Sequence, residues 1–343
     1  METALFHGLL ICILICSGCG RGPIAGETTV TVVVKDESGN PIAGATVGAG
    51  WSRPVQPGLG DHSEHGGDSS GVTDQQGRAE LSVGGLPSIR VTCPGYYSNG
   101  IGSASGIAET YFPKPVLALN RPEIPIVLTS RARPVPMYVR RIDREHRGRI
   151  PLKGQAAGFD LIAGDWVAPH GNGEVTDFEV TMDWTIVGER SLEYTFQVVF
   201  PRPGDGIQRI EISARGRTNQ LLLPREAPVA GYAPRLEWDL ITAGSPNYDP
   251  TNVSRVTEND NYIFRVRSQV DQSGAVVSGM YGKVHGPLIA DVRNERNRRA
   301  ADAQGYIKFN YYLNPDHTRS LEWDCVNNLS GSSPTAEQFA PEP

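Results

Sequence analysis

The sequence contains many short stretches in which hydrophobic and polar residues alternate. In TTVTVVVKD, residues 28–36, the side chains of Val30, Val32 and Val34 occupy every second position, and FEVTMDWT at residues 178–185 has the same period. Successive side chains of a β-strand point to opposite faces, so this period predicts strands with one buried face. Gly, Pro, Asn and Asp, which favour turns, separate the stretches. Further stretches of this kind occur at 192–201, 208–214, 261–270, 305–315 and 319–324.

The spacing of these stretches predicts an all-β protein with two β-sandwiches, of which the second is the larger. Strands that follow one another closely without an intervening helical period are typical of sandwiches. The 343-residue chain also has 39 glycines and 26 prolines spread along it, as turn-rich β proteins require. We expect the first sandwich at 28–130, the second at 131–328 and a disordered polar tail at 329–343. Within the second, LIADVRNERNRRAADAQ at 288–304 predicts a short surface helix.

The beginning of the chain contains an export signal. LLICILIC at residues 9–16 is an apolar run of signal-peptide length that is too short to span a bilayer. It is followed by Ser17, Gly18 and Cys19, and this arrangement resembles the lipobox of bacterial lipoproteins. The chain is therefore expected to leave the cytoplasm.

The lipobox resemblance implies that residues 1–18 are removed, that Cys19 is acylated, and that residues 19–27 form a tether. The acyl chains would attach the protein to a membrane of the cell envelope, facing the periplasm or the exterior. Two features depart from the pattern: residues 1–8 contain no Lys or Arg, and Cys16 stands where Leu is usual. An ordinary secretory signal and an uncleaved anchor therefore remain alternatives.

Cysteine usage fits an exported protein. Of the five cysteines, Cys12 and Cys16 would leave with the signal peptide and Cys19 would carry lipid, so that Cys93 and Cys325 remain in the folded part. In an oxidising compartment such a pair can form a disulfide. Two distant cysteines do not establish a bridge, and we expect two separate buried thiols, with the disulfide as the alternative.

Three stretches of the first predicted sandwich resemble the carboxypeptidase regulatory-like domain. They are DESGNPIAGATV at 36–47, GVTDQQGRAELSV at 71–83 and IRVTCPGYY at 89–97. Gly77 suits a turn position with positive φ, and Asp74 can accept hydrogen bonds from its own turn. The resemblance implies a transthyretin-like, Ig-like β-sandwich that serves as an accessory and has no catalytic residues. The second half is similar only to uncharacterised regions of predicted bacterial lipoproteins.

The loop sequence DHSEHGGDSSG contains candidate metal ligands. His62 and His65 lie beside Asp61, Glu64 and Asp68, and imidazole and carboxylate groups bind zinc and harder cations. Convergence of ligands on a Gly- and Ser-rich loop costs conformational entropy, and the zinc carboxypeptidase pattern of His, two residues and Glu is absent from the chain. We expect a solvated loop and no cofactor, with metal binding by the two histidines as the alternative.

An arginine-rich stretch, RARPVPMYVRRIDREHRGR at 131–149, is a candidate binding surface centred on Arg140 and Arg141. Near a membrane, such a cluster can hold anionic head groups or acidic polysaccharide. The alternative, which we favour, is a solvated face whose arginines pair with Asp and Glu. The net charge of the whole chain is −6, so nucleic acid is not an expected partner.

Aromatic residues near turns provide a second candidate surface. Trp51 follows a predicted strand, and Tyr96 and Tyr97 lie at a turn, where exposed rings could stack on sugars. The alternative is that these side chains belong to the core or its rim, as most Trp and Tyr residues do.

The sequence contains no P-loop and no dinucleotide-binding fingerprint. Asp165, His170 and Glu174 in GDWVAPHGNGE could form an acid–base group, but no nucleophile is placed beside them, so we expect no catalytic residues. The sequence predicts an envelope-anchored, non-catalytic binding or scaffolding module whose partners are the membrane and a glycan or envelope protein. A carbohydrate-binding module for polysaccharide capture and a hydrolase with its site in the second sandwich are the alternatives.

Overall fold

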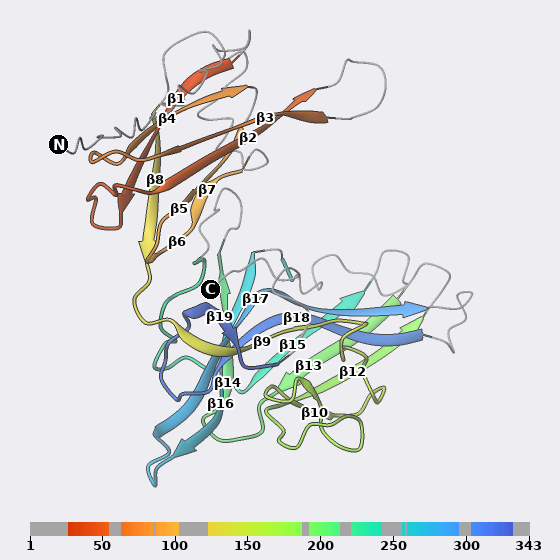
Figure 1. The fold of residues 1–343 in the computed structure, drawn as a ribbon. Coiled ribbons are helices and arrows are strands. Elements are labelled where there is room, and N and C mark those ends of the chain that lie inside the picture. Colours follow the sequence, from red (N-terminus) through yellow and green to blue (C-terminus); the bar gives the residue numbers. More distant parts are fainter. Residues whose placement is uncertain are drawn as a thin grey trace, which may run out of the picture.

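The computed structural model describes residues 27–54, 63–84, 87–102, 123–186, 192–212, 221–241, 256–257, 259–294 and 303–331. Every regular element in these ranges is a β-strand (Figure 1). The prediction of an all-β protein is therefore confirmed. No helix among the described residues is long and apolar enough to cross a membrane.

The N-terminal half forms two four-stranded sheets that share one hydrophobic core. Its strands are β1 (Glu27–Asp36), β2 (Thr46–Pro54), β3 (Ser63–Val72), β4 (Arg78–Gly84), β5 (Pro87–Thr92), β6 (Tyr96–Tyr97), β7 (Asn99–Ile101) and β8 (Glu123–Ser130). One sheet has the order β4-β1-β8-β6 and the other β3-β2-β5-β7. Val30, Val32 and Val34 of β1 are fully buried in the core, because their alternation places them on one face of the strand.

Turns of this fold are closed by aspartates that hydrogen-bond to their own backbone. Asp36, Asp74 and Asp271 each accept hydrogen bonds at 2.8–3.0 Å from the backbone N–H groups two and four residues ahead. Gly77 in the second of these turns has a φ of 73°, and a Cβ atom there would collide with the carbonyl oxygen of Val34. The stretch GVTDQQGRAEL is therefore scaffold, since its Asp and Gly shape the turn between β3 and β4.

The C-terminal half contains a five-stranded and a six-stranded sheet. Its strands are β9 (Val135–Ile142), β10 (Ala157–Asp160), β11 (Asp165–Trp166), β12 (Phe178–Ile186), β13 (Leu192–Val199), β14 (Gly206–Glu211), β15 (Arg235–Ile241), β16 (Asp260–Val270), β17 (Val276–Asn294), β18 (Ala303–Asn314) and β19 (Trp323–Asn328). The sheet orders are β11-β10-β12-β13-β15 and β14-β16-β17-β18-β9-β19. The ring centroids of Phe159 and Phe178 from the first sheet lie 6.1 and 6.2 Å from that of Phe309 from the second, so the two sheets enclose an aromatic core.

The prediction of a surface helix at 288–304 is wrong for its first part. Strand β17 continues through residues 288–294 and pairs with β18, with Asp291 opposite Tyr306. Leu288 and Ala290 are buried whereas Ile289 between them is 37% exposed. This alternation fits a strand, and pairing with a long neighbouring strand outweighs the weak helical propensity of the segment. Residues 295–302 lie outside the described ranges.

All strands of the first two sheets lie before residue 131, and those of the other two begin at Val135. Residues 131–134 are therefore a short linker, which we call the linker below. The domain boundary at residue 131 and the independent folding of each half stay predictions. The signal peptide, Cys19, the tether up to residue 26 and the tail from 332 lie outside the described ranges.

Candidate functional site

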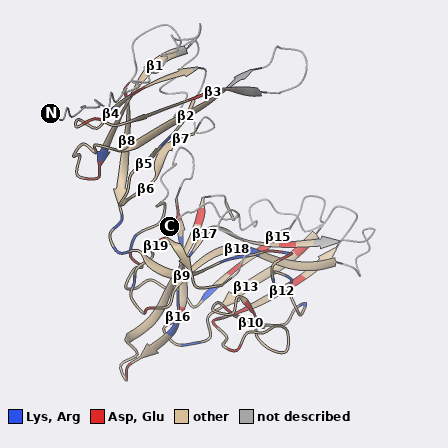
Figure 2. Ribbon diagram, viewed as in Figure 1, with Lys and Arg blue, Asp and Glu red and all other residues tan. Residues whose placement is uncertain are grey.

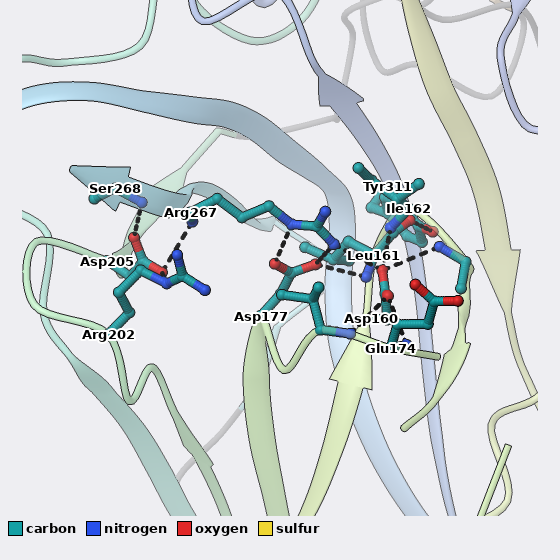
Figure 3. Close-up of polar contacts among 12 residues, drawn as sticks. Asp160, Leu161, Ile162, Glu174, Asp177, Arg202, Asp205, Arg267, Ser268 and Tyr311 are labelled. Atoms are coloured by element: carbon teal, nitrogen blue, oxygen red, sulfur yellow. Dashed lines mark hydrogen bonds and ion pairs between the residues drawn. The ribbon is translucent and has the colours of Figure 1, made fainter. Parts of the chain in front are cut away.

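A loop between β10 and β12, residues 160–177, is held in place by a buried aspartate. Asp160 is 4% exposed, and its Oδ1 accepts hydrogen bonds from the backbone N–H groups of Ile162 and Ala163 at 2.9 and 3.1 Å. Its Oδ2 accepts from the N–H groups of Glu174 and Val175, both at 3.0 Å (Figure 3). One carboxylate therefore joins the beginning of the loop to its end. We call residues 160–177 the braced loop.

An arginine from the opposite sheet completes this brace. Arg267 lies at a β-bulge of β16 with a φ of 54°. Its Nε donates to Asp177 Oδ1 and its Nη2 donates to Asp160 Oδ1, each at 2.8 Å. The backbone N–H of Arg267 donates to Asp205 Oδ2 at 3.0 Å, and Ser268 N–H donates to Asp205 Oδ1 at 2.8 Å (Figure 3). The network thus connects the two sheets of the C-terminal half.

The electrostatics of the network are those of a structural brace. Burial pushes the pKa of Asp160 upward, but the backbone hydrogen bonds from Ala163, Val175 and Glu174 together with the Arg267 charge outweigh it, so its pKa lies below the usual value. Burial raises the pKa of Asp177 above its usual value despite the Arg267 guanidinium, and burial also raises the pKa of Asp205. Because these carboxylates are buried and already accept hydrogen bonds, they suit positioning better than proton transfer to a ligand.

The three residues of the proposed acid–base group are not brought together. Asp165 is 4% exposed and accepts hydrogen bonds from the backbone N–H groups of Trp166 and Asn172 at 2.9 and 3.0 Å. His170 and Glu174 are exposed on the outside of the braced loop, and no hydrogen bond joins the three side chains within this described loop. Asp165 therefore has a structural role, because its carboxylate binds backbone N–H groups of the braced loop.

Arg140 and Arg141 point in opposite directions, because adjacent residues of a strand face opposite sides. Arg140 lies against Gly164 of the braced loop, its Nε atom is buried, and its Nη2 is 3.4 Å from the Ile162 carbonyl oxygen. Arg140 is half-buried, and its role on a binding surface stays a prediction. Arg141 lies on the other face, where its Nε donates to Asp143 Oδ2 at 2.7 Å.

The arginine-rich stretch is not a uniformly basic face. Figure 2 shows charged residues of both signs in the C-terminal half. Arg147 Nη1 is 3.5 Å from Asp165 Oδ2, and Arg144 Nη2 is 3.8 Å from Glu145 Oε1. Arg144 and Arg147, which follow β9, therefore have acidic neighbours.

Arg141 lines a groove of about 340 Å³ on the outer face of β9, β17 and β18. Asp291 and Tyr306 lie directly opposite each other on β17 and β18, and Ile289 and Lys308 form the next cross-strand pair. The other lining residues are Asp143, Arg144, Glu145 and Ile307. The groove thus combines cations, carboxylates and two apolar side chains.

The turn at residues 143–145 lines this groove, and its residues differ in burial and in the contacts that they make. Asp143 binds Arg141 and also His146, whose Nδ1 is 2.7 Å from Asp143 Oδ1. Burial pushes the pKa of Asp143 upward, but the His146 and backbone hydrogen bonds outweigh this, so its pKa lies below the usual value. Arg144 and Glu145 form a longer pair with side chains 46% and 74% exposed. Exposed pairs of this kind are weak, and the Arg144 side chain reaches solvent at the edge of the groove.

The aromatic residues of the N-terminal half do not form an exposed platform. Trp51 is 5% exposed and Tyr97 is fully buried, and half-buried Tyr96 packs against the core. Trp51 is buried because it lies on the inner face of β2, where Gly67 leaves room for its ring. The prediction that Trp51 and Tyr97 present exposed rings to a sugar is therefore wrong.

The stretch GDSSG at residues 67–71 has the Gly-x-Ser-x-Gly spacing of a nucleophile elbow, which sequence reasoning missed. It lies inside β3, which pairs antiparallel with β2. A nucleophile elbow requires a sharp turn from a strand into a helix. Ser69 therefore lacks the backbone geometry of such a nucleophile.

The remaining predicted positions are the two candidate histidine ligands and the two cysteines of the folded part, His62, His65, Cys93 and Cys325. His62 lies outside the described ranges, as does the side chain of His65, and the described residues contain no group of three or more potential metal ligands. Cys93 and Cys325 are free thiols, so the disulfide alternative is not realised here. Burial raises the pKa of both thiols.

Sequence reasoning also missed Arg267 and the groove residues of β17 and β18. A signal for Arg267 exists, since YIFRVR places two arginines directly after and between apolar residues of a predicted strand, and a buried arginine requires carboxylate partners. The groove carries no comparable signal. Its walls come from β9, β17 and β18, which only sheet pairing brings together.

No protein-family model and no curated protein matches the sequence. Among solved structures, the structure of the Streptococcal ancillary pilin is similar, with 13% sequence identity and a TM-score of 0.18. The match covers 56% of this chain and 57% of that chain, little more than half the length of the pilin. At this TM-score the similarity supports no statement about function.

Proposed function

We propose that the protein is an envelope-anchored lipoprotein that binds a partner without catalysing a reaction. The main support is the groove formed by β9, β17 and β18, which is open and whose floor consists of three hydrogen-bonded strands of one sheet. A surface that is already rigid loses little conformational freedom on binding. The lipobox resemblance around Cys19 supports the anchor.

The lining of the groove suits a polar ligand with apolar faces. Arg144 and Lys308 line it with cations, Asp291 lines it with a carboxylate, and Ile289, which is 37% exposed, supplies apolar surface. A glycan or an extended segment of an envelope protein presents this mixture of groups. The polysaccharide-capture alternative accordingly belongs to this groove, since the aromatic residues first considered for it are buried.

The test is a binding screen of the soluble Cys19→Ser protein against a glycan array and purified envelope proteins. For any partner found, the double variant Arg144→Ala/Lys308→Ala should weaken binding tenfold or more, because each charge-assisted contact contributes about 1.5 kcal/mol. Arg235→Ala is the matched control, since Arg235 is an exposed cation on β15 of the other sheet with a side chain 58% exposed.

Two results would contradict the proposal. If the double variant binds as tightly as the unmodified protein, the groove is not the contact site. If the protein converts its ligand to a product, the non-catalytic assignment is wrong.

A further inference from the structure

Backbone hydrogen bonds fasten the linker to both halves of the molecule. Arg131 N–H donates to the Gly95 carbonyl oxygen of the N-terminal half at 2.8 Å. Arg133 N–H donates to Glu322 Oε2 at 2.6 Å, and Val135 N–H donates to the Glu322 carbonyl oxygen at 2.9 Å. Because every second residue from 131 to 135 is held in this way, the connection between the halves has little slack.

Arg225 joins three parts of this junction. Its Nη2 lies 2.7 Å from Glu37 Oε2, in the turn that follows β1 of the N-terminal half. Its Nη1 donates to Glu322 Oε1 at 2.9 Å and to the Ser130 carbonyl oxygen, at the end of β8, at 2.5 Å. The Glu322 side chain is 1% exposed and that of Arg225 is 27% exposed. Charge-assisted hydrogen bonds are stronger in such partly buried surroundings than at an open surface.

A buried aromatic ring fills the space beside these contacts. Tyr97 of β6 is fully buried, and the Arg131 guanidinium lies 5.3 Å from the centre of its ring. Burial is the main reason that the pKa of Tyr97 is raised, and Glu322 adds to the shift. Figure 1 shows the two halves meeting at the end of the N-terminal half that holds β6, next to β19.

We infer from these contacts that the two halves form a single rigid arm, and that Arg225 fixes the angle between them. Domains joined by small polar interfaces normally move relative to one another. Here a single guanidinium holds the Glu37 turn, the end of β8 and the buried Glu322 carboxylate together, while Tyr97 packs beside them. The groove on the C-terminal half would then keep one orientation relative to the N-terminal tether. The inference does not depend on which ligand the groove takes.

Residual dipolar couplings of the soluble Cys19→Ser protein test this inference directly. A rigid arm predicts that couplings from both halves fit one alignment tensor. In Arg225→Ala, which loses all three contacts, the two halves should require two tensors of different magnitude. Two tensors in the protein with Arg225 intact, or one tensor in Arg225→Ala, would overturn the inference.

Two further variants keep the test decisive. Arg78→Ala is the matched control, because it removes an exposed arginine that pairs with Glu123 inside the N-terminal half, so one tensor should remain. If Arg225→Ala does not fold, Glu37→Gln takes its place, since Glu37 is 48% exposed and its loss leaves Glu322 paired. In this variant the couplings of the two halves should fit tensors of different magnitude. A single tensor, unchanged from that of the protein with Glu37 intact, would overturn the inference.

Discussion

At the scale of single residues, Arg267 shows how the interior of the C-terminal half tolerates charge. Its backbone adopts a φ of 54°, which is unusual for a residue other than glycine. The conformation is maintained because Asp205 accepts its N–H while Asp160 and Asp177 bind its guanidinium. The same contacts neutralise the charge and orient the braced loop, so one side chain links a bulge in β16 to the loop between β10 and β12.

Replacement of Arg267 by Met should lower the free energy of unfolding by about 3–5 kcal/mol. Removing one partner of a buried ion pair leaves the other charge uncompensated, and here two carboxylates would be affected. Urea unfolding monitored by tryptophan fluorescence measures the change. Arg235→Ala, which removes an exposed partner 3.9 Å from Glu237, is the control and should cost less than about 1 kcal/mol. A loss for Arg267→Met no greater than for the control would show that the network does not stabilise the fold.

Asp143→Asn should make stability less sensitive to acid. The pKa of Asp143 is lower in the folded protein than its usual value, so its stabilising contribution is present above the unfolded pKa of about 3.9 and is lost as the pH falls through the folded pKa. The variant should therefore be less stable by roughly 1–3 kcal/mol at pH 5, and the difference should shrink towards pH 2. Urea titrations across this range measure it. A difference that does not change with pH would mean that the Asp143 charge contributes nothing.

At the scale of elements, hydrogen bonding in the turns and pairing between strands act at different ranges. Asp36, Asp74 and Asp271 organise their turns through bonds to residues at most four positions away, so the turns could be predicted from the sequence. Strand β17 could not, because its second part is stabilised by pairing with β18 rather than by its own composition. Local patterns therefore predicted the alternating strands better than the long strand.

A fragment of residues 26–130 should fold by itself. Its two sheets enclose a core that includes Val30, Leu81 and Ile124, which are at most 1% exposed, and no residue of that core comes from the C-terminal half. A cooperative thermal transition and β-type circular dichroism are expected. The melting temperature should be lower than in the full chain, because the Tyr97 ring, which is buried in the full chain, becomes exposed to solvent in the fragment. A fragment that stays unfolded while the full chain folds would show that the halves depend on each other.

At the scale of the whole molecule, the junction and the membrane anchor together would decide where the groove is presented. The described chain enters the first sheet at Glu27 (Figure 1). The groove lies on the six-stranded sheet of the C-terminal half. If the arm is rigid, the N-terminal half acts as a spacer of fixed length between the lipid and the groove. This arrangement would suit a scaffolding role as well as ligand capture.

Cys19→Ser should release the protein from membranes. Two or more acyl chains give stable anchoring, and the substitution removes the thiol that would carry them. Fractionation and incorporation of labelled palmitate measure the effect, with Cys16→Ser as the control that keeps the acylated position. A Cys19→Ser protein that fractionates and migrates like the unmodified one would show that the lipoprotein assignment is wrong.

The sequence by itself determined the all-β class, the alternating faces of strands such as β1 and β12, and the aspartate- and glycine-based turns, because these depend on residues close together in the chain. The tertiary structure decided which polar residues meet. It buried Trp51 and Tyr97, turned Arg140 inward and brought Arg267 to Asp160 across 107 positions. It also formed the groove from three strands. Such contacts depend on strand order and register, and a period of two does not encode which strands become neighbours.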